Sequence, residues 1–370
     1  MRIGVDASRA TAQQRTGTEN YSLHLIRALL SLGSQHPIRL YFNQPPSSGL
    51  LGSGVEVRTI PFPRVWTHAR LSWEMLLRPP DVLFVPSHVL PIIHPRRSVV
   101  TIHDLGFLYY PEAHTAFQNA YLRWSTRYNG GSAALVVADS LATRQDLVRH
   151  YRTDPAKIRV IYPGRDESLG RVDDPAVLGE LRARFGLPDD YLLYVGTLHP
   201  RKNLVRLVEA FCAALPALRP GTRLVLAGKV GWHHDALLAR VQQLGLQDLV
   251  LLPGYVAEAD LPALLSGASA FLFPSLHEGF GFPVIEAMAC SVPVVCSNAS
   301  SLPEVAGDAA LLVDPMDTAA WAAAIERVSN DDRLRRELME RGRRQVTRFS
   351  WQSCARQVLE LLEEVGRGLA

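Results

Sequence analysis

Short apolar runs alternate with longer amphipathic stretches along almost the whole chain. Each apolar run before residue 162 is bounded by polar, Gly-containing or Pro-containing segments, which predicts a β-strand. These runs are Ile3–Val5, Ile38–Phe42, Val55–Ile60, Val82–Val85, Val99–Ile102, Leu135–Ala138 and Ile158–Ile161. The stretches between them predict helices over Glu19–Leu32, Arg70–Leu77, Ala116–Tyr128 and Ala142–Tyr151. Because the strands are continuously apolar and alternate with helices, the pattern predicts a parallel sheet covered on both faces.

The same rhythm repeats after the polar stretch Pro163–Pro175, which we interpret as a linker between two domains. The second set of apolar runs is Leu192–Val195, Leu224–Ala227, Leu249–Leu252, Ala270–Phe273, Val292–Val295 and Ala310–Val313. The last stretch, Trp351–Leu362, has apolar residues on one side and predicts a helix. The predicted fold class is therefore α/β, with two doubly wound domains whose parallel sheets face each other across a cleft. In such sheets ligands bind beyond the carboxyl ends of the strands.

The composition fits this prediction and narrows the function classes. The 370 residues suffice for two domains of about 150–200 residues each, and 47% hydrophobic with 20% charged residues is typical of a globular enzyme. A net charge of only +3 gives no support to a nucleic-acid partner. The four cysteines form no C-x-x-C pair, and we interpret Cys212 and Cys290 as buried free thiols. Without a signal-peptide pattern at Met1–Asp6 or a long apolar run, we expect a cytoplasmic protein.

Two carboxylates eight positions apart flank a Gly-rich loop, Glu278-Gly-Phe-Gly-Phe-Pro-Val-Ile-Glu286. The loop follows the apolar run Ala270–Phe273, and Pro283 suits the first position of a helix. Gly279 and Gly281 let backbone N–H groups approach a ligand, and the helix N-terminus adds positive potential. Since amides bind phosphate and carboxylates accept hydrogen bonds from hydroxyls, the segment predicts a site for a phosphorylated sugar.

Arg201 and Lys202 stand at the start of a helix expected over Asn203–Phe211. Two cations beside the positive end of a helix are unfavourable unless an anion binds there, so the pair predicts a diphosphate site. A solvated Arg–Lys pair is the alternative. No Asp-x-Asp follows an apolar strand, so we expect no metal site. The charge of a leaving diphosphate is then left to Lys202, Arg201 and helix N-termini.

Four segments together resemble the retaining glycosyltransferases of the GT-B fold, glycosyltransferase family 4. Glu278–Glu286 resembles the E-x7-E signature of that family, and Val195-Gly-Thr-Leu-His-Pro-Arg-Lys-Asn203 resembles its phosphate-binding turn. Ser301–Asp308 with Leu312–Pro315 resembles its ribose-side loop, and Thr101-Ile-His-Asp104 its catalytic-histidine segment. The resemblance covers most of the chain and favours the mannosyltransferase branch of O-antigen and polysaccharide assembly. It implies an acceptor-binding Rossmann-like domain over residues 1–165 and a nucleotide-sugar-binding one over 166–348. It also implies a terminal helix, within 349–370, that crosses back to the first domain.

The resemblance also implies roles for individual residues. His103, Lys202 and Glu278 would be the catalytic residues. His103 would bond a hydroxyl of the donor sugar, Lys202 would meet the leaving phosphate, and Glu278 would lie close to the sugar. Glu286 would accept hydrogen bonds from the ribose hydroxyls. The other donor-binding residues implied by the resemblance are Gly17, Arg201, Tyr255, Val256, His277, Gly279, Phe280 and Gly281.

The chain departs from the family pattern at Thr197, where many relatives carry Arg, and Arg201 is the candidate replacement. Simpler roles also stay open for two of the implied residues. His103 could be structural, and the adjacent Asp104 could orient its ring or cap the next segment. Gly17, in the segment Arg15-Thr-Gly-Thr18, could be an ordinary loop glycine.

The resemblance implies transfer of a hexose, mannose by preference, with retention of configuration, and the lack of an Asp-x-Asp motif predicts that the transfer is metal-independent. The donor is a nucleotide sugar, with GDP-mannose favoured over a UDP-sugar. The acceptor is a glycan or lipid-linked glycan, and no cofactor is expected. A nucleotide-sugar epimerase or hydrolase on the same fold, and a sugar- or nucleotide-binding module without turnover, stay open as alternatives. No G-x-G-x-x-G follows a strand, which disfavours an NAD-dependent oxidoreductase.

The segment Phe62–Arg78 combines aromatic and basic residues, namely Trp66, Trp73, Arg64, Arg70 and Arg78. A basic amphipathic helix can lie in a membrane interface, which would place the protein peripherally at the inner face of the membrane. Glu74 and the short length favour a packed helix instead, and we expect that helix to help shape the acceptor side.

Overall fold

The computed structural model describes residues 1–11, 17–46, 55–62, 65–87, 89–229, 231 and 235–369. Arg64 and the first two residues of the segment Arg15–Thr18 lie outside these described residues. The chain divides into two compact units, which are described separately. Unit 1 comprises Met1–Gly164 with Phe349–Ala370, and unit 2 comprises Arg165–Arg348.

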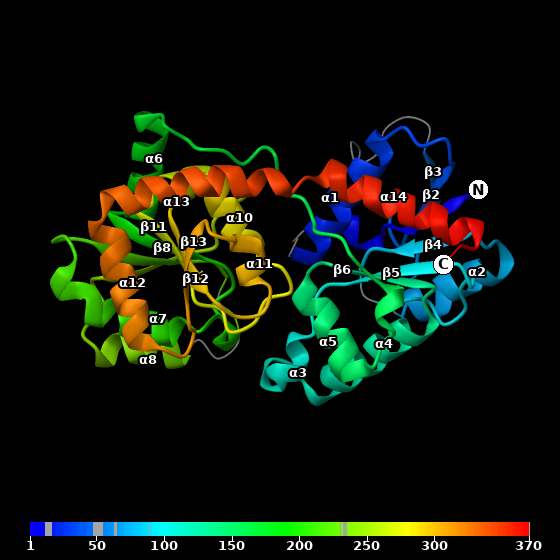
Figure 1. Cartoon of the computed structure of the whole chain (residues 1–370), viewed down its shortest axis with the longest axis horizontal. Helices are drawn as coiled ribbons and strands as arrows, with labels where there is room; N and C mark the ends of the chain where they lie inside the picture. Colours follow the sequence, from blue (N-terminus) through cyan, green and yellow to red (C-terminus); the bar gives the residue numbers. More distant parts are fainter. Residues whose placement is uncertain are drawn as a thin grey trace. The chain divides into compact units, whose positions relative to one another are not determined.

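Within the described residues, unit 1 contains one sheet of seven strands, and every strand pair is parallel (Figure 1). The strands are β1 (Ile3–Asp6), β2 (Ile38–Phe42), β3 (Glu56–Thr59), β4 (Val82–Val85), β5 (Ser98–Ile102), β6 (Leu135–Ala138) and β7 (Ile158–Val160). Their order across the sheet is β3-β2-β1-β4-β5-β6-β7. The chain therefore starts in the middle of the sheet and winds outward in both directions, as in a doubly wound fold.

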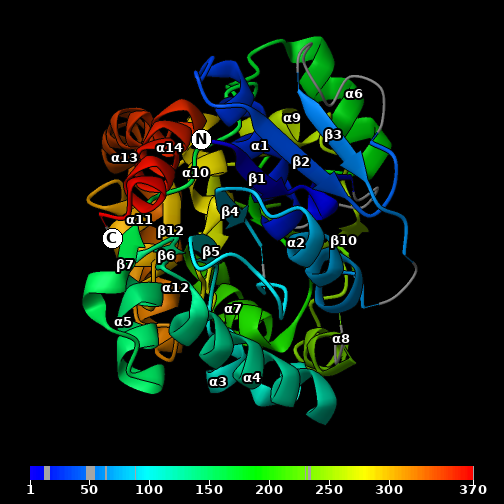
Figure 2. The ribbon, with the colours of Figure 1, turned by 90° about the vertical axis from the view of Figure 1, so that its right-hand side faces the viewer.

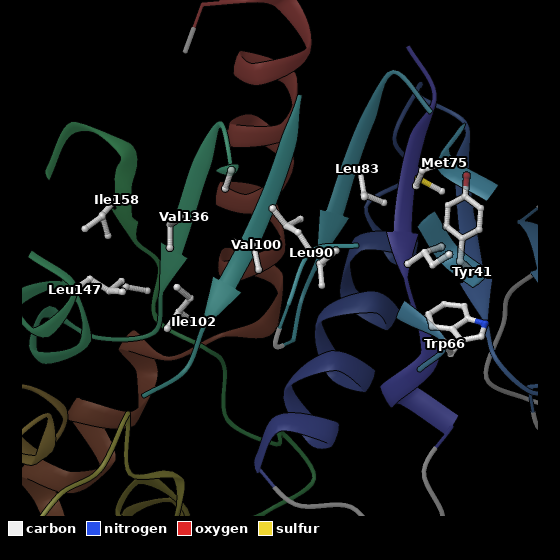
Figure 3. Packing of buried hydrophobic residues seen from close by; sticks show 14 of the residues in the cluster. Tyr41, Trp66, Met75, Leu83, Leu90, Val100, Ile102, Val136, Leu147 and Ile158 are labelled. Carbon is white, nitrogen blue, oxygen red and sulfur yellow. The ribbon is translucent and has the colours of Figure 1, made fainter. Parts of the chain in front are cut away.

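Helices cover both faces of this sheet (Figure 2). They are α1 (Gly17–Ser31), α2 (Ser72–Leu77), α3 (Gly106–Tyr109), α4 (Ala116–Ser132), α5 (Leu141–Tyr151) and α14 (Trp351–Arg367). Figure 2 shows α1 and α14 on one face and α4 and α5 on the other. The core beneath the second face is a cluster of buried side chains from strands and helices, including Leu83, Val100, Val136 and Met75 (Figure 3).

Within the segment Phe62–Arg78, residues 65–78 are packed, as expected, although on one side only. They form a π-helix over Thr67–Leu71 that continues into α2. Trp66 is buried, and its Nε1 donates to the carbonyl oxygen of Ile60 at 2.8 Å. The carboxylate of Glu74 is buried and accepts from Arg58 Nε at 3.0 Å. The opposite side of α2 carries Trp73, whose surface is 55% exposed.

Unit 2 contains a sheet of six strands in its described part, again with every pair parallel. The strands are β8 (Tyr191–Val195), β9 (Arg223–Ala227), β10 (Val250–Gly254), β11 (Ala270–Phe273), β12 (Val294–Ser297) and β13 (Ala310–Val313). Their order is β10-β9-β8-β11-β12-β13, which is the doubly wound dinucleotide-binding order. All the strands expected from the sequence are present in both units, with ends that move by one or two residues.

Helices connect and follow the strands of unit 2. They are α6 (Pro175–Phe185), α7 (Leu204–Ala214), α8 (Asp235–Gln243), α9 (Leu261–Ser266), α10 (Phe282–Ala289), α11 (Leu302–Ala306), α12 (Thr318–Asn330) and α13 (Asp332–Gln345). The strand expected at Val292 begins two residues later because the Val292 amide closes the end of α10 by donating to Ala287 at 3.0 Å. Of the two cysteines expected to be buried, Cys290 is buried but Cys212 is partly exposed.

The C-terminal helix α14 packs against α1 within unit 1. The side chain of Ser350 caps its N-terminus by accepting from the Ser353 amide. The ring of Trp351 stacks on His24, with centroids 5.5 Å apart and planes 12° apart. It also meets Tyr21 edge-on at 5.6 Å. The contact between the start of α14 and the segment after β7 is close, because a Cβ on Gly164 would lie 2.1 Å from the Trp351 amide nitrogen.

Gly164→Ala should therefore destabilise unit 1 by more than about 2 kcal/mol, since backbone atoms have to move to admit the methyl group. Gly170→Ala is the matched control, because a Cβ there would meet nothing within 4 Å. Thermal unfolding should show a lower Tm for Gly164→Ala alone. Equal melting temperatures for the two variants would contradict the close packing of α14.

Candidate active site

The turns after β8 and β9 each contain a glycine with a backbone conformation that residues with a side chain rarely adopt. Gly196 has φ +153°, and Gly228, after β9, has φ +145°. A Cβ on Gly228 would lie 1.9 Å from the Gly196 carbonyl oxygen, so the two loops pack backbone against backbone. The Leu198 amide donates to Lys229 at 2.9 Å and fixes the same contact one step further on.

Arg201 and Lys202 lie in a short 3₁₀ helix, Pro200–Lys202, directly before α7. His199 Nδ1 accepts from the Arg201 amide at 3.2 Å and caps this turn. The helix expected to begin at Asn203 begins at Leu204, because Asn203 adopts the left-handed conformation with φ 58°. The two cations are thus held by a turn rather than by the first turn of the long helix.

The carboxylate of Glu278 joins both cations. Lys202 Nζ donates to Oε1, and Arg201 Nη1 lies 3.3 Å from Oε2. Arg201 also donates to the carbonyl oxygen of His277, and Lys202 Nζ lies 5.2 Å from the centre of the Phe273 ring. Burial raises the pKa of Glu278, but the charges of Lys202 and Arg201 outweigh burial and lower it to about 2. Glu278 is therefore ionised at neutral pH, and the cluster as a whole carries one net positive charge.

The Gly-rich loop between the two carboxylates is fixed by serines of a neighbouring segment. Ser300 Oγ accepts from the Glu278 amide at 2.8 Å. Ser301 Oγ lies 3.0 Å from the Glu278 carbonyl oxygen and 2.8 Å from that of Phe280. Gly281 precedes α10 with φ +110°, a conformation that favours glycine. The N-terminus of α10 therefore opens directly from this loop, while Gly279 stays partly exposed.

Glu286 lies on α10 and is partly exposed. Burial is the main cause that raises its pKa to about 7, and Asp166 and Glu258 raise it further. Glu258 follows the end of β10, where Tyr255 is exposed and Val256 partly buried. Glu286 and the loop after β10 are therefore neighbours. This proximity is needed if Glu286, Tyr255 and Val256 are to contact one nucleoside.

In unit 1, His103 follows β5 and has a partner on each ring nitrogen. Nδ1 lies 2.5 Å from Oδ2 of Asp139, and Nε2 lies 3.1 Å from the Pro86 carbonyl oxygen. Burial lowers the pKa of His103, but the charge and hydrogen bond of Asp139, the charge of Asp104 and the bond to Pro86 together outweigh burial, and the net direction is upward. Because a carbonyl oxygen and a carboxylate both accept, the two bonds together favour the imidazolium form. A bond from His103 to a sugar hydroxyl then requires exchange with Pro86.

The structure decides between the two roles considered for Asp104, which were to orient the His103 ring or to cap the next segment. Asp104 does not hold the ring but accepts from the Gly106 amide at 2.8 Å, so it caps the next segment. Asp139 was not predicted, although it follows β6 as His103 follows the neighbouring strand β5. Tyr21 meets the His103 ring edge-on at 4.7 Å. Gly17 is exposed and begins α1.

The structure thus brings the predicted residues of unit 2 together in two groups, one around Glu278 and one around Glu286. His103 and Gly17 belong to unit 1, and Thr197 is exposed in the turn after β8. Among the described residues, no group of three or more His, Cys, Asp or Glu side chains is arranged to hold a metal ion. No helix in the described part of the chain is both long and apolar enough to cross a membrane.

Solved structures with the same fold cover nearly the whole chain. Sucrose-phosphate synthase from Thermosynechococcus elongatus aligns over 99% of both chains with a TM-score of 0.76 and 21% identity. The Anabaena protein HepE, in complex with UDP-glucose, aligns over 98% of this chain and 100% of its own, with a TM-score of 0.75 and 19% identity. These likenesses confirm the GT-B fold, with two doubly wound units.

Sequence comparisons identify the family. Residues 15–169 match Glycosyltransferase Family 4, and residues 180–345 match Glycosyl transferases group 1. The chain is 36% identical over 291 residues to O-antigen chain mannosyltransferase B of Escherichia coli, covering 78% of this chain and 76% of that protein. It is 30% identical over 274 residues to the serotype-specific mannosyltransferase WbdA of Escherichia coli, but spans only 33% of that protein's length. The chain belongs to glycosyltransferase family 4 and is a glycosyltransferase.

Glu286→Gln should stabilise the protein increasingly above pH 4.5, and fully above about pH 7. The pKa of Glu286 in the folded protein is raised from its ordinary value of 4.5 to about 7, so ionisation opposes folding. The penalty is absent below pH 4.5, grows between the two values and is complete above pH 7. Since Glu286 is partly exposed, we expect a gain of about 1 kcal/mol, or ~2–4 °C in Tm, at pH 8.

The same melts at pH 4.5 should give no difference between Glu286→Gln and the parent protein. Glu180→Gln, at an exposed position of α6, is the control and should change Tm at neither pH. Equal Tm values for Glu286→Gln and the parent protein at pH 8 would show that folding does not raise the pKa of Glu286.

Proposed function

We propose that the protein is a retaining, metal-independent mannosyltransferase that uses GDP-mannose and extends a glycan acceptor. The proposal rests on one observation above all, the cluster of Arg201 and Lys202 around Glu278 at the carboxyl ends of β8 and β11. The identity with O-antigen chain mannosyltransferase B supports mannose as the transferred sugar.

The cation pair suits a leaving diphosphate. With one carboxylate facing two cations, the cluster keeps a net positive charge that a diphosphate can neutralise. Negative charge develops on the phosphate oxygen as the bond to the anomeric carbon breaks, and Lys202 meets that charge. Amides of Gly279, Phe280 and Gly281 and the positive end of α10 add to the same stabilisation. No step in this scheme needs a metal ion.

Transfer with retention then follows from attack on the face that the diphosphate leaves. The acceptor oxygen forms its bond to the anomeric carbon as the bond from that carbon to the phosphate oxygen breaks, and the hydroxyl proton passes to the departing phosphate. Glu278 lies beside the sugar, where its negative charge stabilises a carbon that becomes positive. Charge stabilisation and positioning therefore account for the reaction without a covalent intermediate.

The remaining residues bind the ends of the donor. Glu286 accepts from the ribose hydroxyls in its ionised form, so donor binding lowers its raised pKa. Tyr255 and Val256 contact the nucleobase, and His277 lines the sugar site together with Arg201. His103, held by Asp139, bonds a hydroxyl of the donor sugar, and Gly17 approaches the donor phosphates.

We extend the proposal to a lipid-linked acceptor, with α2 touching the membrane that carries it. The exposed side of α2 presents Trp73, Leu76 and Leu77, followed by the exposed Arg78. Apolar side chains beside a cation suit the boundary between acyl chains and anionic headgroups.

A transfer assay with defined donors tests the proposal. The purified protein should transfer mannose from GDP-mannose to an α-mannose oligosaccharide, with an α-linked product in the NMR spectrum and unchanged activity after treatment with EDTA. UDP-glucose and UDP-galactose should be poor donors. Transfer from a UDP-sugar alone would overturn the choice of donor, and an inverted product would overturn retention. Activity that EDTA removes and Mn²⁺ restores would overturn metal independence. Epimerisation or hydrolysis of the donor without transfer would overturn the whole.

Lys202→Ala and Glu286→Ala should lose transfer in different ways. Lys202 meets charge that grows in the transition state, so its loss should lower kcat by about 10²–10³-fold. Glu286 meets the ribose, which does not react, so its loss should raise KM for the donor with little change in kcat. Lys202→Arg keeps the charge and should lose less than Lys202→Ala. Kinetics of Lys202→Ala like those of the parent protein would contradict the assignment of the phosphate site.

A further inference from the structure

Helix α4 carries four aromatic residues on one face. Phe117, Tyr121, Trp124 and Tyr128 stand at spacings of four, three and four, which places them in one row along the helix. Trp124 and Tyr128 are stacked, with centroids 5.4 Å apart and planes 6° apart. Tyr121 and Trp124 lie 5.8 Å apart at 39°. We call this row the aromatic stripe.

The aromatic stripe is not the face that attaches α4 to unit 1. That face consists of buried residues, namely Ser125, Thr126, Asn129 and Gly130. By contrast, Phe117 is 81% exposed and Trp124 45% exposed. Tyr121 and Tyr128 are partly buried, the latter against the hydrophobic core. A row of large aromatic rings with exposed members such as Phe117 and Trp124 marks an interaction surface, even though Tyr121 and Tyr128 also pack against the unit.

Hydrogen bonds fix the rings of the aromatic stripe. His68 Nε2 lies 2.8 Å from the Tyr121 hydroxyl, and the His68 ring meets Trp124 at 5.5 Å. The Tyr128 hydroxyl donates to the carbonyl oxygens of Pro91 and Ile92 at 3.0 and 3.1 Å. Because the rings are held before a ligand arrives, binding costs little side-chain entropy.

The chemistry of the aromatic stripe favours a sugar chain over a lipid surface or another protein. Flat rings with a negative face attract the slightly positive C–H groups on the apolar side of a pyranose ring. The exposed Arg123 and Arg127, elsewhere on α4, add hydrogen-bond donors for sugar hydroxyls on the same helix. The row contains no aliphatic side chain, and α4 has no acidic residue. Exposed aliphatic side chains gather on α2, and Ile92, whose carbonyl oxygen accepts from Tyr128, is a further exposed aliphatic residue beside the row.

The aromatic stripe also adjoins the sheet edge that carries His103. Burial raises the pKa of Tyr121 and Arg9 opposes that rise, so Arg9, in the turn after β1, lies near the phenol. The loop after β4 accepts from Tyr128 at one end and from His103, through Pro86, at the other. The row therefore starts at the carboxyl edge of the sheet and leads away from it along α4.

We propose that the aromatic stripe binds the sugar rings of the acceptor glycan that lie several residues away from the reacting end. The inference rests on the proposed function, because it assigns part of the acceptor site of a glycosyltransferase. It goes further by naming the residues, the ligand class and a dependence on acceptor length.

Kinetics with acceptors of different length test the aromatic stripe. The probes are α-linked mannose oligosaccharides from a disaccharide to a hexasaccharide, with GDP-mannose as donor. Trp124→Ala should raise KM for the hexasaccharide about tenfold while kcat and the KM for the disaccharide stay unchanged. Trp124→Phe keeps an aromatic face and should restore most of the affinity. Leu369→Ala removes an exposed apolar side chain of unit 1 outside the row, 70% exposed, and should change nothing.

Binding of the hexasaccharide without donor, measured by saturation-transfer NMR, separates this inference from the proposed function. Binding that Trp124→Ala abolishes supports the aromatic stripe even if no donor gives transfer, an outcome that would overturn only the proposed function. Transfer that proceeds with equal KM for parent protein and Trp124→Ala at every length overturns only the aromatic stripe. Trp124→Ala could also lose binding to anionic lipid vesicles, or change oligomeric state, while glycan binding stays the same. Either result overturns the assignment of the aromatic stripe to a glycan. Circular dichroism verifies that the variants fold.

Discussion

The buried carboxylate of Glu278 determines the geometry of the unit 2 site, because it joins two loops that are far apart in the sequence. It lies 76 positions from Lys202, yet it binds both Lys202 and Arg201. A buried carboxylate without these cations would be costly, and two adjacent cations without the carboxylate would repel each other. The mutual neutralisation keeps both loops in place, and the remaining positive charge is the basis of the diphosphate site proposed above.

This ion cluster depends in turn on the order of the strands. In a doubly wound parallel sheet, all carboxyl ends lie on one edge, and β8 and β11 are neighbours there. The same rule places Asp139 beside His103 in unit 1, since β5 and β6 are neighbours. Both units therefore use one arrangement, in which polar residues of the loops that follow neighbouring apolar strands meet at the sheet edge.

The strands were predictable because they are continuously apolar and short, as strands buried on both faces are. A strand begins later than predicted where a backbone amide bonds a neighbouring helix instead of the next strand, as at Val292, whose amide closes the end of α10. The residues of the candidate site in unit 2 could be proposed from the sequence for a related reason. Glu278, Gly281 and Glu286 belong to one continuous segment, and Arg201 and Lys202 to another, so their chemistry could be recognised locally.

The sequence by itself determined the fold class, the strands and the residue types that could bind a phosphorylated sugar. Only the tertiary structure decided which of these residues contact each other. It paired His103 with Asp139, 36 positions away, and left the adjacent Asp104 to cap a turn. It also held the rings of α4 with His68, from a segment more than fifty positions earlier. The physical reason is that periodicity records which side of an element is buried, whereas contacts between side chains depend on which strands and helices become neighbours after folding.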